Sequence, residues 1–221
     1  MALICVPFVE KTVEEDVALA NSLDCDIVEV RLDYLSETVG LEKLKDIKKP
    51  VIATCMPAWE GGLFSGTEEE RLGILESCLP YCKYVSIELK TEETMAENLI
   101  KKAKKKGVKV IVASHNFKNT PDFEDILDIL SDEERAGADI AKVAFMANTN
   151  ADVLTLMRCL VEEKRKVPVI ALSMGERGRI SRVIAPFFGS YLTFASSASG
   201  KESAPGQIQL DFLKRLLELC K

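Results

Sequence analysis

The stretch DIVEVRLD (residues 26–33) indicates a β-strand whose two faces differ in polarity. Successive side chains of a strand point to opposite faces, so an apolar face alternates with a charged one: Val28, Val30 and Leu32 against Glu29, Arg31 and Asp33. The apolar face suits packing against helices. The charged face then points to the other side of the sheet, where an ionised side chain is costly unless it is paired. This strand predicts a sheet that helices cover on the outside and that carries charged groups inside.

Strands and helices alternate along the whole chain. Runs rich in Val, Ile and Leu predict strands at 2–6, 26–32, 51–56, 84–89, 108–114, 139–145, 168–174 and 191–196. Apolar residues three and four apart predict helices at 12–23, 41–48, 68–79, 92–106, 123–136, 150–164, 178–188 and 207–220. Strands that are separated by helices pair in parallel.

Eight strand–helix units in 221 residues predict a compact α/β fold, a (β/α)8 TIM barrel that spans residues 1–221 as a single catalytic domain. An open, doubly wound sheet is the alternative. No Gly-rich phosphate loop follows the first strand, so a dinucleotide-binding fold is the poorer explanation.

Composition excludes several classes of protein. Hydrophobic residues make up 47% of the chain and charged residues 29%, which excludes disordered, collagen-like and coiled-coil proteins. The net charge of −6 argues against general nucleic-acid binding. The segment MALICVPFVEK lacks the basic region of a signal peptide, and no run approaches the ~18 apolar residues that span a bilayer. We therefore expect a cytoplasmic protein without nucleic-acid or membrane partners.

The cysteines and the histidine limit the metal sites that are possible. The seven cysteines include no CxxC pair, which is typical of reduced thiols that pack as small hydrophobic groups. His115 is the one histidine, so a His-rich metal site is impossible, and the cysteine spacing matches no usual zinc motif.

Several strands place an ionisable side chain on the face that would point into the barrel. The alternation rule gives this set as Glu29, Arg31, Glu88, His115 and Lys142. Each alone fits a structural ion pair, and we expect Glu88 to be the partner of an interior cation such as Lys142 or Arg31. Barrel active sites are built at the carboxyl ends of the strands, so the convergence of the whole set predicts a functional site there.

Lys142 and His115 together suggest covalent chemistry. Lys142 has apolar neighbours in its strand, and burial favours the neutral amine, which attacks a ketone or aldehyde to form an imine. The iminium acidifies the neighbouring C–H bond, and an imidazole with an unperturbed pKa of ~6.5 is a suitable base. Adjacent strands lie ~4.8 Å apart, so both groups could reach one substrate. The pair predicts an imine-based elimination or an aldol reaction.

Five segments, taken together and in order, resemble the type I 3-dehydroquinate dehydratase family. They are EVRLDYL (29–35), ASHNF (113–117), KVAFMANT (142–149), ALSMGERGRISR (171–182) and SAPGQI (203–208). The resemblance implies a lyase that removes water from 3-dehydroquinate by syn elimination and gives 3-dehydroshikimate. This is the third step of the shikimate pathway to chorismate and the aromatic amino acids. It implies a Schiff base and no cofactor, because the protein amine is the electron sink.

The resemblance also implies a role for each matching residue. Lys142 would form the imine with the C3 ketone, His115 would take the C2 proton and protonate the leaving C1 hydroxyl, and Glu60 would orient His115. Further residues would bind the substrate. Arg182 would hold its carboxylate, Glu29 and Arg31 its hydroxyls, Ser203 and Gln207 would contact it from a closing loop, and Met174 and Phe194 would line the pocket.

One position departs from the family pattern. The third strand of the family usually ends in an arginine that binds substrate oxygens, and this chain has Met56 there. A thioether carries no charge and donates no hydrogen bond. We therefore expect weaker substrate binding with the imine chemistry intact.

Two other functions compete with the dehydratase: a Schiff-base aldolase on the same barrel, and an inactive relative that keeps the pocket. The combination of His115 with SAPGQ argues against the first, and the presence of both Lys142 and His115 argues against the second. The resemblance also suggests a homodimer, for which Phe187, Phe188, Phe212 and Leu216 are either an apolar contact patch or core.

Overall fold

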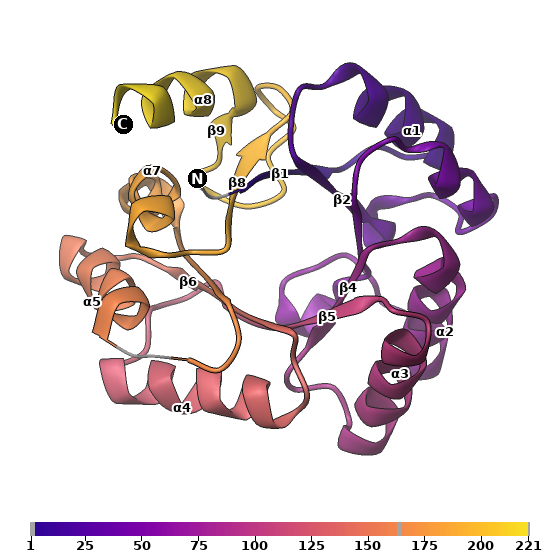
Figure 1. Cartoon of the computed structure of the whole chain (residues 1–221), viewed down its shortest axis with the longest axis horizontal. Helices are drawn as coiled ribbons and strands as arrows, with labels where there is room; N and C mark the ends of the chain where they lie inside the picture. The colour runs from indigo at the N-terminus through magenta and orange to yellow at the C-terminus, as the bar shows by residue number, and fades with distance from the viewer. Residues whose placement is uncertain (1–2, 163–164, 221) are drawn as a thin grey trace.

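The computed structural model describes residues 3–162 and 165–220 of the chain. Parallel strands curl into a barrel, and the helices form a ring around it (Figure 1). The strands are β1 (Leu3–Phe8), β2 (Ile27–Arg31), β3 (Val51–Thr54), β4 (Tyr84–Glu88), β5 (Lys109–Asn116), β6 (Ile140–Met146), β7 (Val169–Met174), β8 (Leu192–Ser196) and β9 (Ile208–Gln209).

The α-helices are α1 (Val13–Ser22), α2 (Glu68–Cys78), α3 (Glu93–Lys105), α4 (Phe123–Arg135), α5 (Asn150–Glu162), α6 (Gly175–Gly178), α7 (Ser181–Ile184) and α8 (Leu210–Leu219). Short 3-10 helices are η1 (Leu32–Tyr34), η2 (Leu41–Asp46), η3 (Ala58–Glu60), η4 (Leu79–Tyr81) and η5 (Ala185–Phe188). Capping boxes begin α1 and α2, where Thr12 pairs with Glu15 and Thr67 with Glu70.

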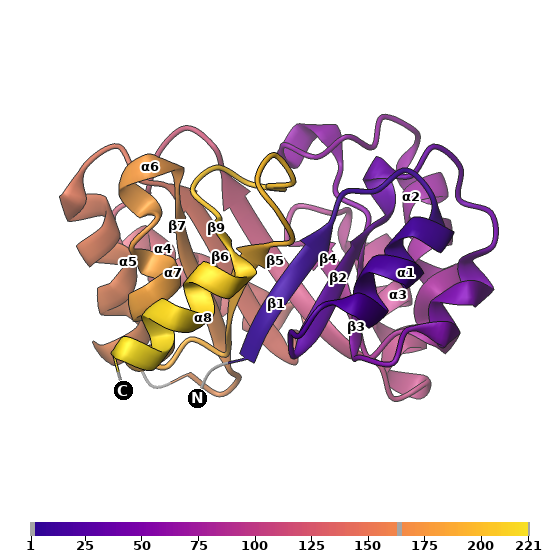
Figure 2. The ribbon, with the colours of Figure 1, turned by 90° about the horizontal axis from the view of Figure 1, so that it is seen from above.

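The predicted barrel is confirmed. The ladder runs in the order β7-β6-β5-β4-β3-β2-β1-β8-β9, and every pair in it is parallel. Where β7 and β8 meet, the N–H of Tyr191, the residue before β8, donates to the carbonyl of Val169 of β7 at 2.8 Å and closes the barrel. Figure 2 shows the strands side on, with both chain termini at the end of the barrel where the strands begin.

Three predicted helices differ from the structure. The segment 41–48 forms the 3-10 helix η2, whose rise of ~2.0 Å per residue lets a short connection cover more distance than an α-helix would. The segment 178–188 is divided among α6, α7 and η5, and Pro186 lies at the start of η5. The segment 207–220 begins as β9, because Ile208 pairs with Ala195 of β8, and α8 starts only at Leu210. Residues 163 and 164 of the predicted helix 150–164 lie outside the described residues.

The barrel interior changes character along the strands. Its amino end is apolar, since Cys5, Ile27, Ile52, Tyr84 and Ile111 belong to one buried cluster. Two residues further along the same strands, the inward positions become polar or small: Glu29, Thr54, Ser86 and Ala113. The valines that alternate with them, such as Val28, Val85 and Val110, pack against the helices. The apolar floor therefore supports a polar layer at the carboxyl end.

A buried arginine that the sequence analysis did not identify links several elements at the carboxyl end of the barrel. Arg71 of α2 has no exposed surface, and it donates to Glu68, to the carbonyl of Cys55 at 3.0 Å and to the hydroxyl of Thr91 at 2.8 Å. It also forms an ion pair with Glu88. The expectation that Glu88 pairs with Lys142 or Arg31 was wrong, because α2 supplies this cation from outside the sheet.

No helix in the described part of the chain is both long enough and apolar enough to cross a bilayer.

Removing the Arg71 side chain should destabilise the fold strongly. In Arg71→Met, Glu88 keeps a buried carboxylate without its cation, and we expect the free energy of unfolding to fall by about 3–5 kcal/mol in urea titrations. The exposed pair of Lys101 and Glu97 provides the control, because Lys101→Met should cost less than about 0.5 kcal/mol. Equal losses in the two variants would contradict a stabilising role for the buried network.

Candidate active site

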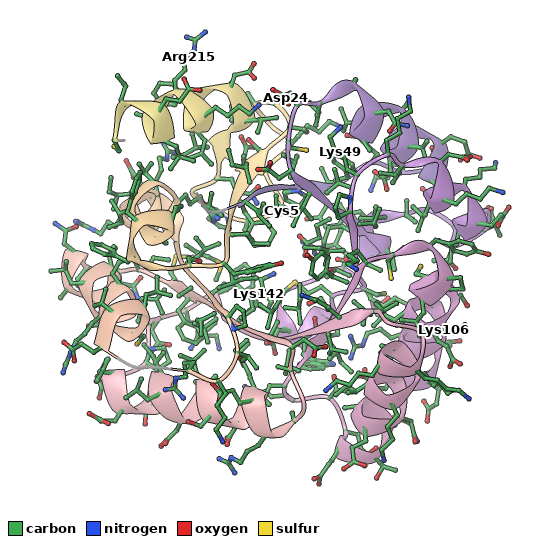
Figure 3. All side chains as sticks on the ribbon, in the orientation of Figure 1. Cys5, Asp24, Lys49, Lys106, Lys142 and Arg215 are labelled. Carbon is green, nitrogen blue, oxygen red and sulfur yellow. The ribbon has the colours of Figure 1, made fainter. Side chains whose placement is uncertain are left out.

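A cavity lies at the carboxyl end of the barrel. The sequence-predicted residues that line it are Glu29, Arg31, Met56, His115, Lys142, Met174, Arg182, Phe194, Ser203 and Gln207. They come from strands β2, β5, β6, β7 and β8, from α7, and from the segments that follow β3 and β8. Figure 3 places Lys142 near the centre of the ring of helices, whereas Lys106 and Arg215 lie at its periphery. The curved sheet thus brings residues that are up to 178 positions apart in the sequence, Glu29 and Gln207, to one cavity.

Lys142 lies between a carboxylate and an aromatic ring. Its Nζ is 3.8 Å from Oε1 of Glu29 and 4.7 Å from the centre of the Phe194 ring. Glu29 is itself held by the hydroxyl of Thr54, which donates to Oε1 at 2.8 Å. The amine is therefore almost fully enclosed and lies beside one acidic side chain.

His115 and Glu60 form the second unit of the site. Oε1 of Glu60 accepts the backbone N–H of His115 at 2.7 Å and lies 3.6 Å from Nδ1 of the ring. Glu60 is buried although its neighbour Trp59 is 52% exposed, so Glu60 is not a surface loop residue. It reaches His115 from behind and does not itself line the cavity.

Burial controls the protonation of His115. It lowers the pKa of the imidazole, and the nearby Lys142 lowers it further, while Glu60 raises it. A lowered pKa favours the neutral ring, which is the form that accepts a proton. Ala113 pairs in register with Lys142, and His115 pairs with Ala144, so the imidazole lies one inward position closer to the cavity mouth than the amine.

Arg31 has a fixed orientation. Its Nε and one terminal nitrogen donate to the two oxygens of Asp33 at 2.8 and 2.7 Å. Asp33 also accepts the backbone N–H groups of Met56 and Leu63, at 3.2 and 3.1 Å. One aspartate therefore joins the guanidinium to the segment after β3. These contacts raise the pKa of Arg31 despite its burial.

Arg182 is buried without an acidic partner among the described residues. It is 2% exposed, and it donates hydrogen bonds to the carbonyls of Gly206 and Pro205, at 3.1 and 3.4 Å. Burial alone lowers its pKa to about 10. A buried cation without a counter-ion is costly, so this position is suited to an anionic ligand.

The loop after β8 covers the site. Oε1 of Gln207 accepts the N–H of Ser203 at 2.8 Å, and Nε2 of Gln207 donates to the Ser203 hydroxyl at 3.1 Å. At Gly206, whose φ is +83°, a Cβ would lie 2.2 Å from the carbonyl oxygen of Gly175. Only glycine fits this close approach. An ion pair of 2.8 Å between Lys201 and Glu10 ties the loop to the segment after β1.

Met56 lines the cavity and is 4% exposed. The cavity wall therefore carries an uncharged thioether at position 56. The cations that line the cavity are Lys142, Arg31 and Arg182, as far as the described residues go.

Sequence reasoning missed five lining residues: Thr54, Phe117, Ala144, Leu172 and Ala204. The alternation of side chains along a strand predicts four of them. Thr54, Phe117, Ala144 and Leu172 each lie two positions from a predicted site residue and therefore point to the same side of the chain. Ala204 carries no such signal, since it lies on an irregular loop.

A family model described as Type I 3-dehydroquinase matches residues 4–221. The 3-dehydroquinate dehydratase of Methanocaldococcus jannaschii is 38% identical over 222 residues, which cover 98% of this chain and 98% of that protein.

Two further proteins extend the comparison. The bifunctional 3-dehydroquinate dehydratase/shikimate dehydrogenase of Arabidopsis thaliana is 39% identical over 227 residues, and the match spans 99% of this chain but 36% of that protein. The crystal structure of 3-dehydroquinate dehydratase from Geobacillus kaustophilus superposes with a TM-score of 0.91 at 28% identity, over 99% of this chain and 91% of that one. The chain belongs to the type I 3-dehydroquinase family.

Proposed function

We propose that this protein is a 3-dehydroquinate dehydratase, a hydro-lyase of the shikimate pathway that acts as one catalytic domain in the cytoplasm. It converts 3-dehydroquinate to 3-dehydroshikimate through a Schiff base on Lys142. The observation that carries the proposal is the combination within one cavity of an enclosed amine, an imidazole of lowered pKa and a buried arginine without an acidic partner. Family membership supports the choice of substrate.

The reaction begins when Nζ of Lys142 attacks the C3 ketone of the substrate. Water leaves, and an iminium links C3 to the protein. Glu29, 3.8 Å from the amine, is placed to take up and return the protons of this step. Arg182 binds the substrate carboxylate and so determines which face of C2 points toward His115.

His115 then removes the proton from C2. The electron pair moves onto the imine nitrogen and forms an enamine, which expels the C1 hydroxyl as the imidazolium protonates it. A second water attacks C3, the product ketone forms, and Lys142 is released as the free amine. Glu60 contacts His115 from behind and keeps its ring directed into the cavity. The reaction needs no external electron sink, because the iminium supplies one.

The other cavity residues select and enclose the substrate. Glu29 and Arg31 bind ring hydroxyls, while Met174 and Phe194 form apolar walls. Ser203 and Gln207 already bind each other in the loop that covers the site, and they exchange these bonds for bonds to the substrate when it is present.

We also propose that the protein is a homodimer. Ile180, Phe187, Phe188 and Phe212 are between 41% and 57% exposed. They lie on or beside α7, η5 and α8, and α7 and α8 are neighbours in Figure 1. A patch of this kind suits a second copy of the chain. Leu216 is half-buried against the core and contributes less.

Borohydride trapping tests the Schiff base. Incubation with 3-dehydroquinate and sodium borohydride should inactivate the protein and leave the reduced ligand on Lys142, located by peptide mass mapping. Lys142→Met should show neither turnover nor adduct. His115→Gln should still form the adduct while turnover falls by roughly 10²–10⁴-fold, because the imidazole acts after the imine. An adduct on another lysine, or none in a folded protein, would refute the assignment.

Met56→Arg tests the departure from the family pattern. A guanidinium at this wall can add a charged hydrogen bond to the substrate, which is worth about 1.5–3 kcal/mol. We expect KM to fall roughly ten- to a hundredfold with kcat little changed. Met56→Leu is the control for volume and should leave KM near its original value. An unchanged KM in Met56→Arg would show that this position does not limit binding.

The dimer proposal predicts that charge on the patch separates the subunits. Wild type should sediment at twice the monomer mass at micromolar concentration, and the double variant Phe187→Asp/Phe212→Asp should sediment as a monomer. Val39 is 69% exposed and lies on the loop between η1 and η2, so Val39→Asp should leave the dimer intact. A wild type that remains monomeric would exclude the proposal.

A further inference from the structure

A buried carboxyl lies behind the two strands that carry Lys142 and His115. Glu133 belongs to α4 and has no exposed surface. It continues the buried face that Ile126 and Leu130 begin, at the spacing where a helix packs apolar side chains onto a barrel. A carboxyl at such a position costs burial free energy that an apolar residue would not.

Glu133 contacts the two strands that carry His115 and Lys142, which are β5 and β6. Its Oε2 accepts the backbone N–H of Lys142 at 2.9 Å. The carboxyl also faces the hydroxyl of Ser114, the residue before His115, and Ser114 pairs in register with Val143, the residue after Lys142. Oε1 has no hydrogen-bond partner within the described residues. One side chain from outside the sheet thus reaches both strands at the level of the reactive groups.

The environment favours the uncharged form of this group. Burial raises the pKa of Glu133 well above its ordinary range, and Glu60 adds to the increase, whereas Ser114 and Lys142 lower it. A protonated carboxyl keeps a carbonyl oxygen that accepts the Lys142 N–H.

We propose that Glu133 is a positioning residue, which fixes the backbone of Lys142 from outside the barrel and thereby the direction in which the amine enters the cavity. The inference rests on the proposed function, because the direction of the amine matters for turnover only if Lys142 forms the imine. Glu133 does not line the cavity, so it acts through Lys142 and not on the substrate.

Two substitutions separate positioning from packing. Glu133→Met keeps the length of the side chain but removes the acceptor, and we expect kcat to fall roughly ten- to a hundredfold with KM little changed. Its melting temperature should fall by less than that of Leu130→Ala, because the Lys142 amide loses its acceptor while an apolar group replaces a buried polar one. Glu133→Gln keeps an acceptor oxygen and should recover most of the lost turnover. A Met variant with wild-type kcat, or a Gln variant as impaired as the Met variant, would overturn the proposal.

Hydrogen exchange gives a measurement that needs no turnover. The amide of Lys142, followed by mass spectrometry of the β6 peptide, should exchange faster in Glu133→Met than in wild type and as slowly as wild type in Glu133→Gln. Equal exchange in all three proteins would refute the positioning role whatever their activities. Failure of the proposed function would instead appear as wild type that does not convert 3-dehydroquinate.

Leu130→Ala is the matched control, because Leu130 packs on the same face of α4 one turn earlier and its side chain has no hydrogen-bond acceptor. It should melt at a lower temperature than wild type while kcat and the exchange of the Lys142 amide stay the same. If Leu130→Ala lowers kcat as much as Glu133→Met, loosening of α4 explains both variants and the proposal fails.

Discussion

A charge inside this barrel is costly unless a partner compensates it, because the low dielectric of a packed interior disfavours an isolated ion. The structure meets this constraint with pairs that join different elements. Arg31 binds Asp33, which in turn binds the backbone after β3, and Glu88 binds Arg71 from α2. These pairs fix the carboxyl end of the barrel as a rigid polar layer above an apolar floor. The cavity depends on that layer for its shape.

Two cations differ from the rest, and both face the cavity. Arg182 binds only carbonyl oxygens among the described residues, and Lys142 has Glu29 at 3.8 Å, too far for a hydrogen bond. Among the described residues, the protein therefore keeps a buried guanidinium without an acidic partner in the cavity where an anionic ketone would bind. A substrate with a carboxylate supplies the missing counter-charge at one end of the cavity and a carbonyl carbon at the other. The buried arginine thus accounts for binding of the carboxylate, and the enclosed amine accounts for reaction at the carbonyl carbon.

Two buried acids that do not line the cavity, Glu60 and Glu133, hold the backbone of residues that do. Glu60 touches His115 and Glu133 touches Lys142, each through the backbone N–H of the residue that it contacts. A hydrogen bond to the backbone fixes the position of the Cα atom from which a side chain extends. Packing around the side chain then leaves few rotamers available to it. Both acids are buried, and neither needs to contact the substrate to affect the reaction.

Local patterns in the sequence determined the barrel and much of the site. The period-two alternation in strands such as 26–32 decided which side chains face inward, because successive residues of a strand must point to opposite faces. The same rule assigns Glu29, Arg31, His115 and Lys142 to the inner face of the barrel. Resemblance to a family added Glu60, Arg182, Ser203 and Gln207, which no periodicity could assign.

Only the tertiary structure decided which groups are partners. Glu88 pairs with Arg71 and Glu133 reaches Lys142, and both contacts join a helix to a strand. Helical spacing places Glu133 on the buried face of α4, but it does not say which strand lies opposite. Such contacts depend on the rotation and height of each helix against the barrel, and these are set by packing of the whole molecule. For the same reason the segments 41–48 and 178–188 did not become regular helices, since the path around the barrel overrode their local pattern.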